Sequence, residues 1–243
     1  TPFKAGQLGF YVQDKWDVST ALQLTFGIRA DIPLYLNQPT RNVVFNSSQY
    51  ARNYGVRTGE RPSSYCMLSP RLGFRWFADS EHRTVLRGGV GIFNGRAPFV
   101  WLENIWANTG VEMKGTNITE NVPQSQAYAM DPADAAASAA GTASAPTINT
   151  VDKNFRFPQV FRANLAWEQR LPLGIDMTIE GLFTKDMNNV WFENLALIDN
   201  GDKIYAVSNQ YPNSATTYYS QKLGGYYAIV NLTNTNKGYS YQG

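Results

Sequence analysis

The sequence has little of the residue types that build catalytic and metal sites, with one cysteine and one histidine in 243 residues. Cys66 has no partner in the chain, which excludes a disulfide framework. His82 lies in the polar stretch DSEHR, where a lone histidine is expected to be a solvated turn residue. Neither a zinc site nor a Cys-His nucleophile is supported. The sequence therefore predicts no catalytic site, no cofactor and no metal site.

Long apolar runs and concentrated charge are also missing. No run of about 18 apolar residues could form a transmembrane helix, and the start TPFKAGQLGF has no signal-peptide pattern. Charged residues make up 16% of the chain, against about 25% in typical soluble domains. The net charge is only +2 and no Lys/Arg run occurs, so the sequence predicts no nucleic-acid partner. The 14% aromatic content suits a surface that meets a medium less polar than water, or a carbohydrate.

What the sequence does have is alternation of apolar and polar residues with period 2, which predicts β-strands with one apolar face. It runs through six stretches, namely 6–16, 21–30, 68–77, 85–93, 160–169 and 175–183. A seventh strand is predicted at 226–232 or at 238–242. Asp14 and Lys185 break the pattern, near expected strand ends. Nearly all other charges fall on the polar face, namely Lys15, Arg29, Arg71, Arg75, Arg87, Arg162, Glu168, Asp176 and Glu180.

Strand length and loop layout favour a membrane barrel over a soluble sandwich. The alternating runs are about 9–12 residues long, whereas soluble strands peak at about 5–6 and a tilted strand needs about 9–11 to cross hydrocarbon. Short turns at 17–20, 78–84 and 171–174 alternate with long loops at about 31–66, 96–157 and 187–225. This layout is typical of an outer-membrane β-barrel with periplasmic turns and extracellular loops. The low-complexity stretch 127–146 is expected to be a surface loop.

Two similar hexapeptides, VWLENI (100–105) and VWFENL (190–195), each follow a strand that leads into a long loop. Tryptophan suits a membrane interface because its ring is apolar and its N–H needs a partner. The first interpretation is an aromatic girdle with each strand continuing above the bilayer. The second is an extracellular substrate pocket lined by Phe99, Trp101, Trp106, Trp191 and Phe192.

Several longer stretches resemble the barrel of TonB-dependent outer-membrane receptors. They include LGFYVQDKWDVSTALQLTFGIRAD, SPRLGFRWF, LRGGVGIFNGRAPFVWLENIWANTG and NTNKGYSY, and also FRFPQVFRANLAWEQRLPLGIDMTIEGLFTKDMNNVWFENL. The type that these stretches resemble is the Oar-like, carboxypeptidase-regulatory-domain-bearing receptors of Bacteroidota. The resemblance covers most of 6–110 and 155–242. It implies an all-β, antiparallel up-and-down barrel of 22 strands in the outer membrane of a Gram-negative bacterium, of which this chain supplies about seven.

The resemblance also implies partners and a function. The partners are outer-membrane lipid, the receptor's own plug domain, the TonB-ExbB-ExbD complex and a surface lipoprotein. No plug domain or TonB-engaging motif is found in 1–243, so we interpret the chain as a barrel fragment. The implied function is uptake of a scarce nutrient such as a siderophore, a peptide or a glycan. The eight lumen-lining charges would be Arg29, Arg71, Arg75, Arg87, Arg162, Glu168, Asp176 and Glu180.

Two other hypotheses stay open at this point. One is an outer-membrane barrel for adhesion or assembly that transports nothing. The other is a soluble all-β domain that binds sugars on its aromatic side chains.

Overall fold

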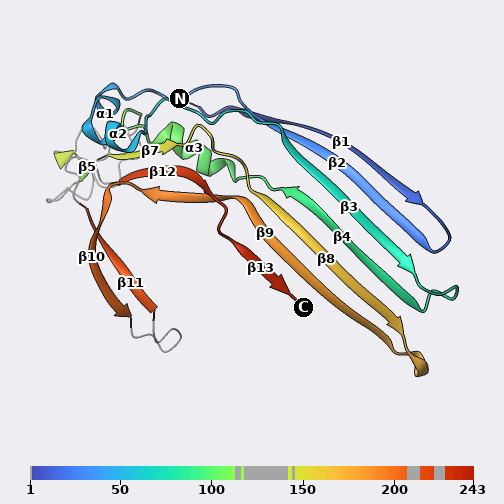
Figure 1. Ribbon diagram of the computed structural model, residues 1–243. Helices are drawn as coiled ribbons and strands as arrows, with labels where there is room; N and C mark the ends of the chain where they lie inside the picture. Colours follow the sequence, from blue (N-terminus) through green and yellow to red (C-terminus); the bar gives the residue numbers. More distant parts are fainter. Residues whose placement is uncertain (1, 113–115, 118–141, 144–145, 207–213, 222–227) are drawn as a thin grey trace, which may run out of the picture.

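The computed structural model describes residues 2–112, 116–117, 142–143, 146–206, 214–221 and 228–243 (Figure 1). For 116–117, 142–143, 197–206 and 214–221 it describes the backbone alone. No helix within these residues is long and apolar enough to cross a membrane. The Ala-rich part of 127–146 and the side chains of 197–202 lie outside the described set.

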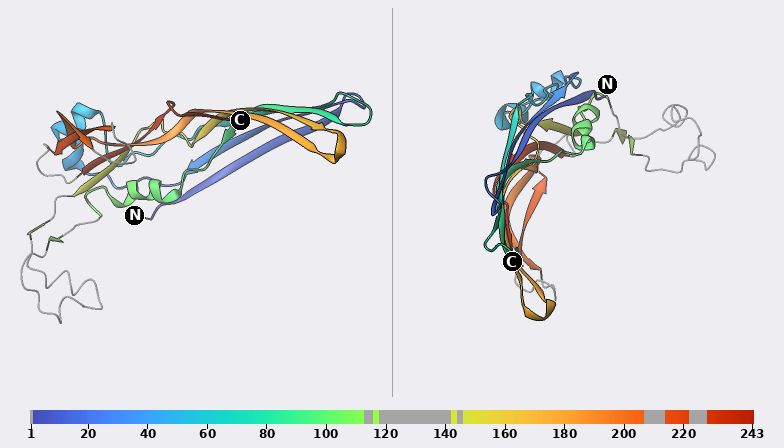
Figure 2. Two further views of the ribbon diagram at one scale, coloured as in Figure 1. Left: turned by 90° about the horizontal axis from the view of Figure 1, so that it is seen from below. Right: turned by 90° about the vertical axis from the view of Figure 1, so that its right-hand side faces the viewer.

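Six long strands form one antiparallel sheet in which each strand pairs with the next. They are β1 (Ala5–Asp17), β2 (Leu22–Tyr35), β3 (Met67–Phe77), β4 (Thr84–Asn94), β8 (Gln159–Arg170) and β9 (Asp176–Asn194). Their lengths run from 11 residues in β3 and β4 to 19 in β9. The predicted up-and-down antiparallel sheet and its six strands are confirmed. The sheet is open and curved, like a section of a barrel wall (Figure 2).

The three short turns lie together at one end of the sheet, and the long loops lie at the other (Figure 1). The third turn contains a short helix, η1 (Pro172–Gly174). The loops hold α1 (Val43–Asn46), α2 (Gln49–Tyr54), α3 (Phe99–Ala107), β5 (Thr116–Asn117), β6 (Thr142–Ala143), β7 (Thr147–Val151), β10 (Leu197–Ala206) and β11 (Ser214–Gln221). The first loop starts after Tyr35 rather than at residue 31, because β2 keeps its pairing with β1 up to Tyr35.

Both stretches proposed for the seventh strand are strands, β12 (Ala228–Thr235) and β13 (Tyr239–Gln242). They pair with β9 in one register, since Thr235 lies opposite Asn189 and Tyr239 lies opposite Lys185. They therefore form one seventh strand that is interrupted at 236–238. At the loop end of the sheet β12 also pairs in parallel with β7.

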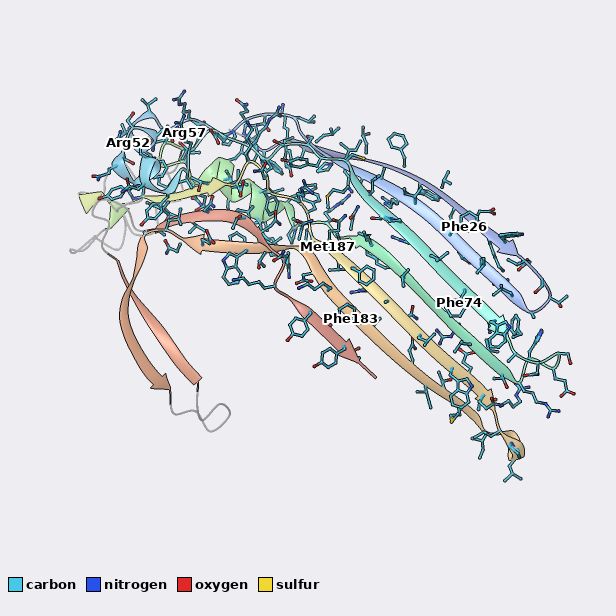
Figure 3. The ribbon with its side chains drawn as sticks, in the orientation of Figure 1. Phe26, Arg52, Arg57, Phe74, Phe183 and Met187 are labelled. Carbon is cyan, nitrogen blue, oxygen red and sulfur yellow. The ribbon has the colours of Figure 1, made fainter. Side chains whose placement is uncertain are left out.

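The register places apolar side chains of neighbouring strands in rows on one face of the sheet. One row contains Phe26, Leu72, Val90, Ala163 and Phe183. No second layer covers this apolar face among the described residues. Many of its side chains stay exposed, from 41% at Phe183 to 71% at Val12, and others such as Leu24, Phe74 and Ile92 are half-buried among their neighbours in the sheet. Figure 3 shows Phe26, Phe74 and Phe183 spread over the sheet. A soluble sheet would bury such a face, so the apolar face needs a nonaqueous neighbour.

Three tryptophans lie on the apolar face near the short turns. Trp76 and Trp167 belong to one row because both lie opposite Leu86, and Trp16 belongs to the adjacent row. Their exposed fractions are 55%, 45% and 43% for Trp16, Trp76 and Trp167. These three tryptophans are at the opposite end of the sheet from the girdle that the hexapeptides suggested.

The two residues that break the alternation both lie on the apolar face. Asp14 is opposite Phe26, near the end of β1 as expected. Lys185 is in the middle of the 19-residue β9, not near its end. It is nevertheless close to the loop-end edge of the sheet, because β4 and β8 stop at Asn94 and Gln159 while β9 continues. Its ammonium donates to the Asn236 carbonyl at 2.8 Å.

The hydrophobic core lies among the loops and not in the long sheet. One cluster joins Trp106, Leu102 and Ile105 of α3 to Phe155, Phe157, Tyr35 and Leu232. A second cluster joins Phe45 and Ala51 of α1 and α2 to Ile148 and Ile229. The loops therefore fold as a packed cap over the end of the sheet that is opposite the turns (Figure 1).

Candidate functional site

The polar face of the sheet carries all eight charged residues that the sequence placed there. Opposite residues of an antiparallel pair point to the same side. Gly27, Arg71, Gly91 and Arg162 therefore form one polar row, and Arg75, Arg87, Ala166 and Glu180 form another. Arg29 is opposite Ser69, Glu168 is opposite Thr178, and Asp176 is opposite Arg170. The register therefore places all eight side chains on one face of the sheet, and that this face lines a lumen stays a prediction at this point.

Four of these charges form a cluster nearer the short turns. Arg75 and Arg87 face each other directly, which is unfavourable for like charges. Glu168 relieves this by lying 2.5 Å from the Arg87 Nε and 3.9 Å from the Arg75 Nη2. Glu180 lies 3.8 Å from Arg87. Each side chain is 30–49% exposed, so each pair contributes at most about 1 kcal/mol to stability.

A second network centres on Asp31, whose side chain is only 6% exposed. Arg29 forms a bidentate pair with it, with Nε and Nη2 at 2.8–3.0 Å from its oxygens. Gln7 donates to the same carboxylate at 3.1 Å and Asn94 donates at 3.3 Å. Arg96 in turn donates to the Gln7 Oε1 at 2.9 Å. The carboxylate therefore has donors on three strands.

The network continues across the rest of the sheet. Gln159 donates to the Asn94 Oδ1 at 2.8 Å, and Asn188 donates to the Gln159 Oε1 at 3.3 Å. A register shift between Gln159 and Val160 lies at this point in β8. The chain of bonds from Gln7 through Asp31, Asn94 and Gln159 to Asn188 joins β1, β2, β4, β8 and β9. It forms a polar belt where the sheet meets the cap.

Sequence reasoning missed this belt. Asp31 was assigned to the first loop, although its spacing of two from Arg29 continues the alternation and could have placed it on the polar face. Asn94, Gln159 and Asn188 carried no comparable signal, because only the folded strands bring them together.

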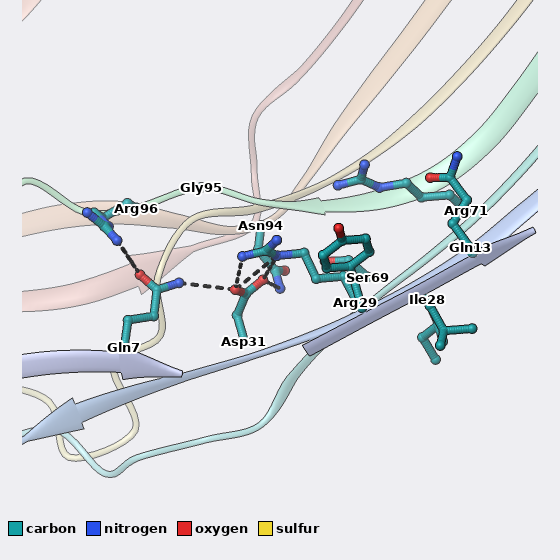
Figure 4. Close-up of a pocket in the computed structure, with 13 residues that line it drawn as sticks. Gln7, Gln13, Ile28, Arg29, Asp31, Ser69, Arg71, Asn94, Gly95 and Arg96 are labelled. Atoms are coloured by element: carbon teal, nitrogen blue, oxygen red, sulfur yellow. Dashed lines mark hydrogen bonds and ion pairs between the residues drawn. The ribbon is translucent and has the colours of Figure 1, made fainter. Parts of the chain in front are cut away.

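An open cavity of about 530 Å³ adjoins the belt on the polar face (Figure 4). Three arginines line it, Arg29, Arg71 and Arg96, together with a single carboxylate, Asp31. Its other polar lining side chains are Gln7, Tyr11, Gln13, Ser69 and Asn94. Figure 4 shows the bonded chain from Arg96 through Gln7 to Asp31 on one side and Arg71 on the other.

α3 and the polar face lie on the same side of the sheet. Arg96, just before α3, reaches Gln7 on that face, and Phe3 packs on Trp106 of α3 at 4.6 Å. In Figure 2 the sheet curves around this side. A wall that is concave and polar inside, and convex and apolar outside, has the geometry of a barrel in a membrane.

The sequence matches the family model described as an outer membrane beta barrel domain over residues 1–243. The chain belongs to this outer membrane beta barrel family. No curated protein and no solved structure matches it. Family membership places the protein in the outer membrane, which rules out the soluble sugar-binding alternative. In an outer-membrane barrel the apolar face contacts lipid and the polar face lines the lumen. Trp16, Trp76 and Trp167 are then at an interface level.

The two hexapeptides of this barrel adopt different structures. VWFENL continues β9 as a strand to Asn194, as predicted. For VWLENI the prediction of a continuing strand is wrong, because the residues form α3. Pro98 precedes the first helical residue, and Leu102, Ile105 and Trp106 recur at helical spacing and are buried. Burial of that face against the loop cluster decides the local structure.

Of the five aromatic side chains proposed for a substrate pocket, three belong to α3 in the cap and two lie near the end of β9. The two hexapeptides touch, since the Trp101 and Phe192 rings are 5.6 Å apart at 87°. Phe99 packs on Phe3 at 5.8 Å. Trp191 and Phe192 remain 53% and 45% exposed, whereas Trp106 is fully buried and contributes packing alone. That the exposed members bind a substrate stays a prediction.

Among the residues with described side chains, no group of three or more His, Cys, Asp or Glu side chains could hold a metal ion. Cys66 is exposed and His82 stacks on Phe77 at 4.0 Å in the second turn.

Proposed function

We propose that this barrel segment belongs to a TonB-dependent receptor that takes up a scarce nutrient across the outer membrane. The observation that carries the proposal is the arginine-rich lumen face beneath a folded cap of extracellular loops. A barrel used only as an anchor needs an apolar outer face, but it does not need a charged wall and a cavity in its lumen. The resemblance of the strand sequences to TonB-dependent receptors supports the same function.

In this proposal the cap and the wall have different tasks. The extracellular loops capture the nutrient, and the exposed Trp191 and Phe192 and the half-buried Trp101 offer aromatic surfaces for it. The lumen charges then border the path inward and contact a plug domain. Energy comes from the inner-membrane TonB-ExbB-ExbD complex, and a surface lipoprotein is a further partner. The nutrient class (siderophore, peptide or glycan) is left to experiment.

The test uses the full-length protein in its native host. Deleting its gene should slow growth on one limiting nutrient among iron-siderophore complexes, oligopeptides and glycans, and deleting TonB should reproduce that defect. The purified receptor should also bind the purified periplasmic domain of TonB. If growth is unchanged on every source and TonB does not bind, the adhesion or assembly barrel becomes the better explanation.

A further inference from the structure

The cavity on the lumen face has a surplus of positive charge. It is lined by three arginines and one aspartate. The Asp31 carboxylate is fully engaged, because it accepts hydrogen bonds from Arg29, Gln7 and Asn94. Arg96 donates to a neutral amide oxygen, that of Gln7. No described carboxylate therefore pairs with Arg71 or Arg96.

Arg71 is the most available of these cations. It is exposed, and among the described residues its guanidinium contacts the Phe93 ring, 4.6 Å from the ring centre, without an ion pair. Gly27 and Gly91 lie opposite it on the two neighbouring strands. An added Cβ on Gly91 would lie 3.1 Å from the Pro70 carbonyl oxygen, 3.2 Å from the Arg71 Cγ and 3.2 Å from the Phe93 ring. The glycines thus leave room for the guanidinium to lie across the face of the sheet.

A buried hydroxyl lies in the same wall. Ser69 is 0% exposed, lines the cavity, and its Oγ has no hydrogen-bond partner among the described residues. It is opposite Arg29 on β2 and two residues from Arg71 on β3. Gln13, opposite Gly27, adds an amide donor to the lining. Buried polar groups are normally satisfied, so this hydroxyl marks a polar position in the wall that the described residues leave without a partner.

We propose that this cavity binds an oxyanion group, a carboxylate or a phosphate, of a small solute in the lumen. Arg71 supplies the main charge, Arg96 adds to the positive potential because Arg29 already offsets Asp31, and Gln13 donates a hydrogen bond. Guanidinium groups match the planar oxygens of both oxyanions. A volume of about 530 Å³ is within the range of small-molecule sites. This inference rests on the proposed function and names an anionic substrate class for it.

The experiment measures binding of succinate, of its neutral analogue succinamide and of inorganic phosphate to the purified full-length receptor by calorimetry. Succinate or phosphate should bind and succinamide should not. Arg71→Gln should weaken binding by about tenfold, the loss expected for one charged hydrogen-bonding partner. Arg162→Gln is the matched control, because Arg162 lies in the same row, two strands away, and does not line the cavity. It should change binding by less than about twofold at physiological salt.

A second variant separates geometry from net charge. Gly91→Ala keeps every charge but should displace the Arg71 side chain, and it should weaken binding too. Circular dichroism of each variant confirms the fold. The proposal is overturned if neither anion binds, which would indicate that the protein's own acidic side chains fill the cavity, or if the Arg71 and Arg162 variants weaken binding equally. Because TonB is absent from this assay, failure of TonB binding would refute the proposed function without changing this result.

Discussion

At the scale of single residues, two glycines on the lipid face have opposite surroundings. Gly88 of β4 and Gly181 of β9 lie in one row, on either side of Leu165 of β8. An added Cβ at Gly88 would lie 2.7 Å from the Asn164 carbonyl oxygen and 3.0 Å from the Phe74 ring. At Gly181 nothing lies within 4 Å. Gly88 is therefore required by close packing under Phe74, whereas Gly181 is not.

Replacing these glycines by alanine should separate the two roles. Gly88→Ala should lower the free energy of unfolding by about 1–3 kcal/mol, because the backbone must shift to admit the methyl group. Gly181→Ala should be neutral or stabilising by up to about 1 kcal/mol, because alanine restricts the unfolded chain. Urea unfolding of the full-length protein in lipid vesicles measures both. Equal effects would contradict the packing role of Gly88.

At the scale of elements, the cap depends on contacts between segments far apart in the chain. Trp101 of α3 packs edge-on against Phe192 of β9. Trp191, the next residue in β9, alternates to the other side and lies opposite Thr233. The two similar hexapeptides adopt different structures because their surroundings differ. VWLENI packs into the loop cluster as part of α3, whereas VWFENL pairs with β12 as part of β9.

A double-mutant cycle tests the contact between the copies. Trp101→Ala and Phe192→Ala should be coupled by about 0.5–1.5 kcal/mol, as expected for an edge-to-face aromatic pair. Trp101→Ala and Trp191→Ala should show coupling close to zero. Hydrogen exchange of the α3 amides gives the local opening free energy of each variant. Equal coupling in both cycles would show that the ring contact does not hold α3 against β9.

At the scale of the whole molecule, the two faces of the sheet meet different media. Phe26 lies on the apolar face, and its neighbour Thr25 lies on the polar face between Lys15 and Gly73. An arginine in hydrocarbon loses its hydration, whereas an arginine in a wet lumen keeps it. Among the described residues the hydrophobic clusters lie in the cap, outside the membrane, and the wall has no such cluster. A barrel wall needs none, because lipid covers its apolar face.

Arginine substitutions at these adjacent positions should report on the two media. Phe26→Arg should destabilise the full-length barrel by about 2–4 kcal/mol in vesicles if its row lies near the bilayer midplane. Thr25→Arg should cost less than about 1 kcal/mol, because the wet lumen hydrates the guanidinium even though it faces Lys15. Urea unfolding in vesicles gives both values. Similar values for the two variants would mean that lipid does not contact the Phe26 face.

Much of the fold could be predicted because its signals are local. Alternation along β2 places Leu24, Phe26 and Ile28 on one side and Arg29 on the other without knowledge of any other strand. The three short turns then fix three of the neighbouring strand pairs, namely β1 with β2, β3 with β4 and β8 with β9. The register places all eight of the charged residues on one face of the sheet, as the alternation predicts.

The candidate site could be predicted only in part. Arg29 and Arg71 were placed in the lumen, but the partnership of Arg29 with Asp31 and the isolation of Arg71 were not foreseen. Asp31 and Asn94 are 63 residues apart in sequence, so no local pattern links them. The helix at VWLENI was missed for a similar reason, since its buried face is defined by residues of other loops.

The sequence by itself determined which side of each strand is apolar, because side-chain direction in a strand follows position parity. It also determined which ends carry turns and which carry loops. Only the tertiary structure decided how the loops pack, where the polar belt crosses the sheet and which arginines, Arg71 among them, are left without a carboxylate. Those outcomes depend on contacts between distant segments, whose energies exceed the weak local preferences of the residues involved.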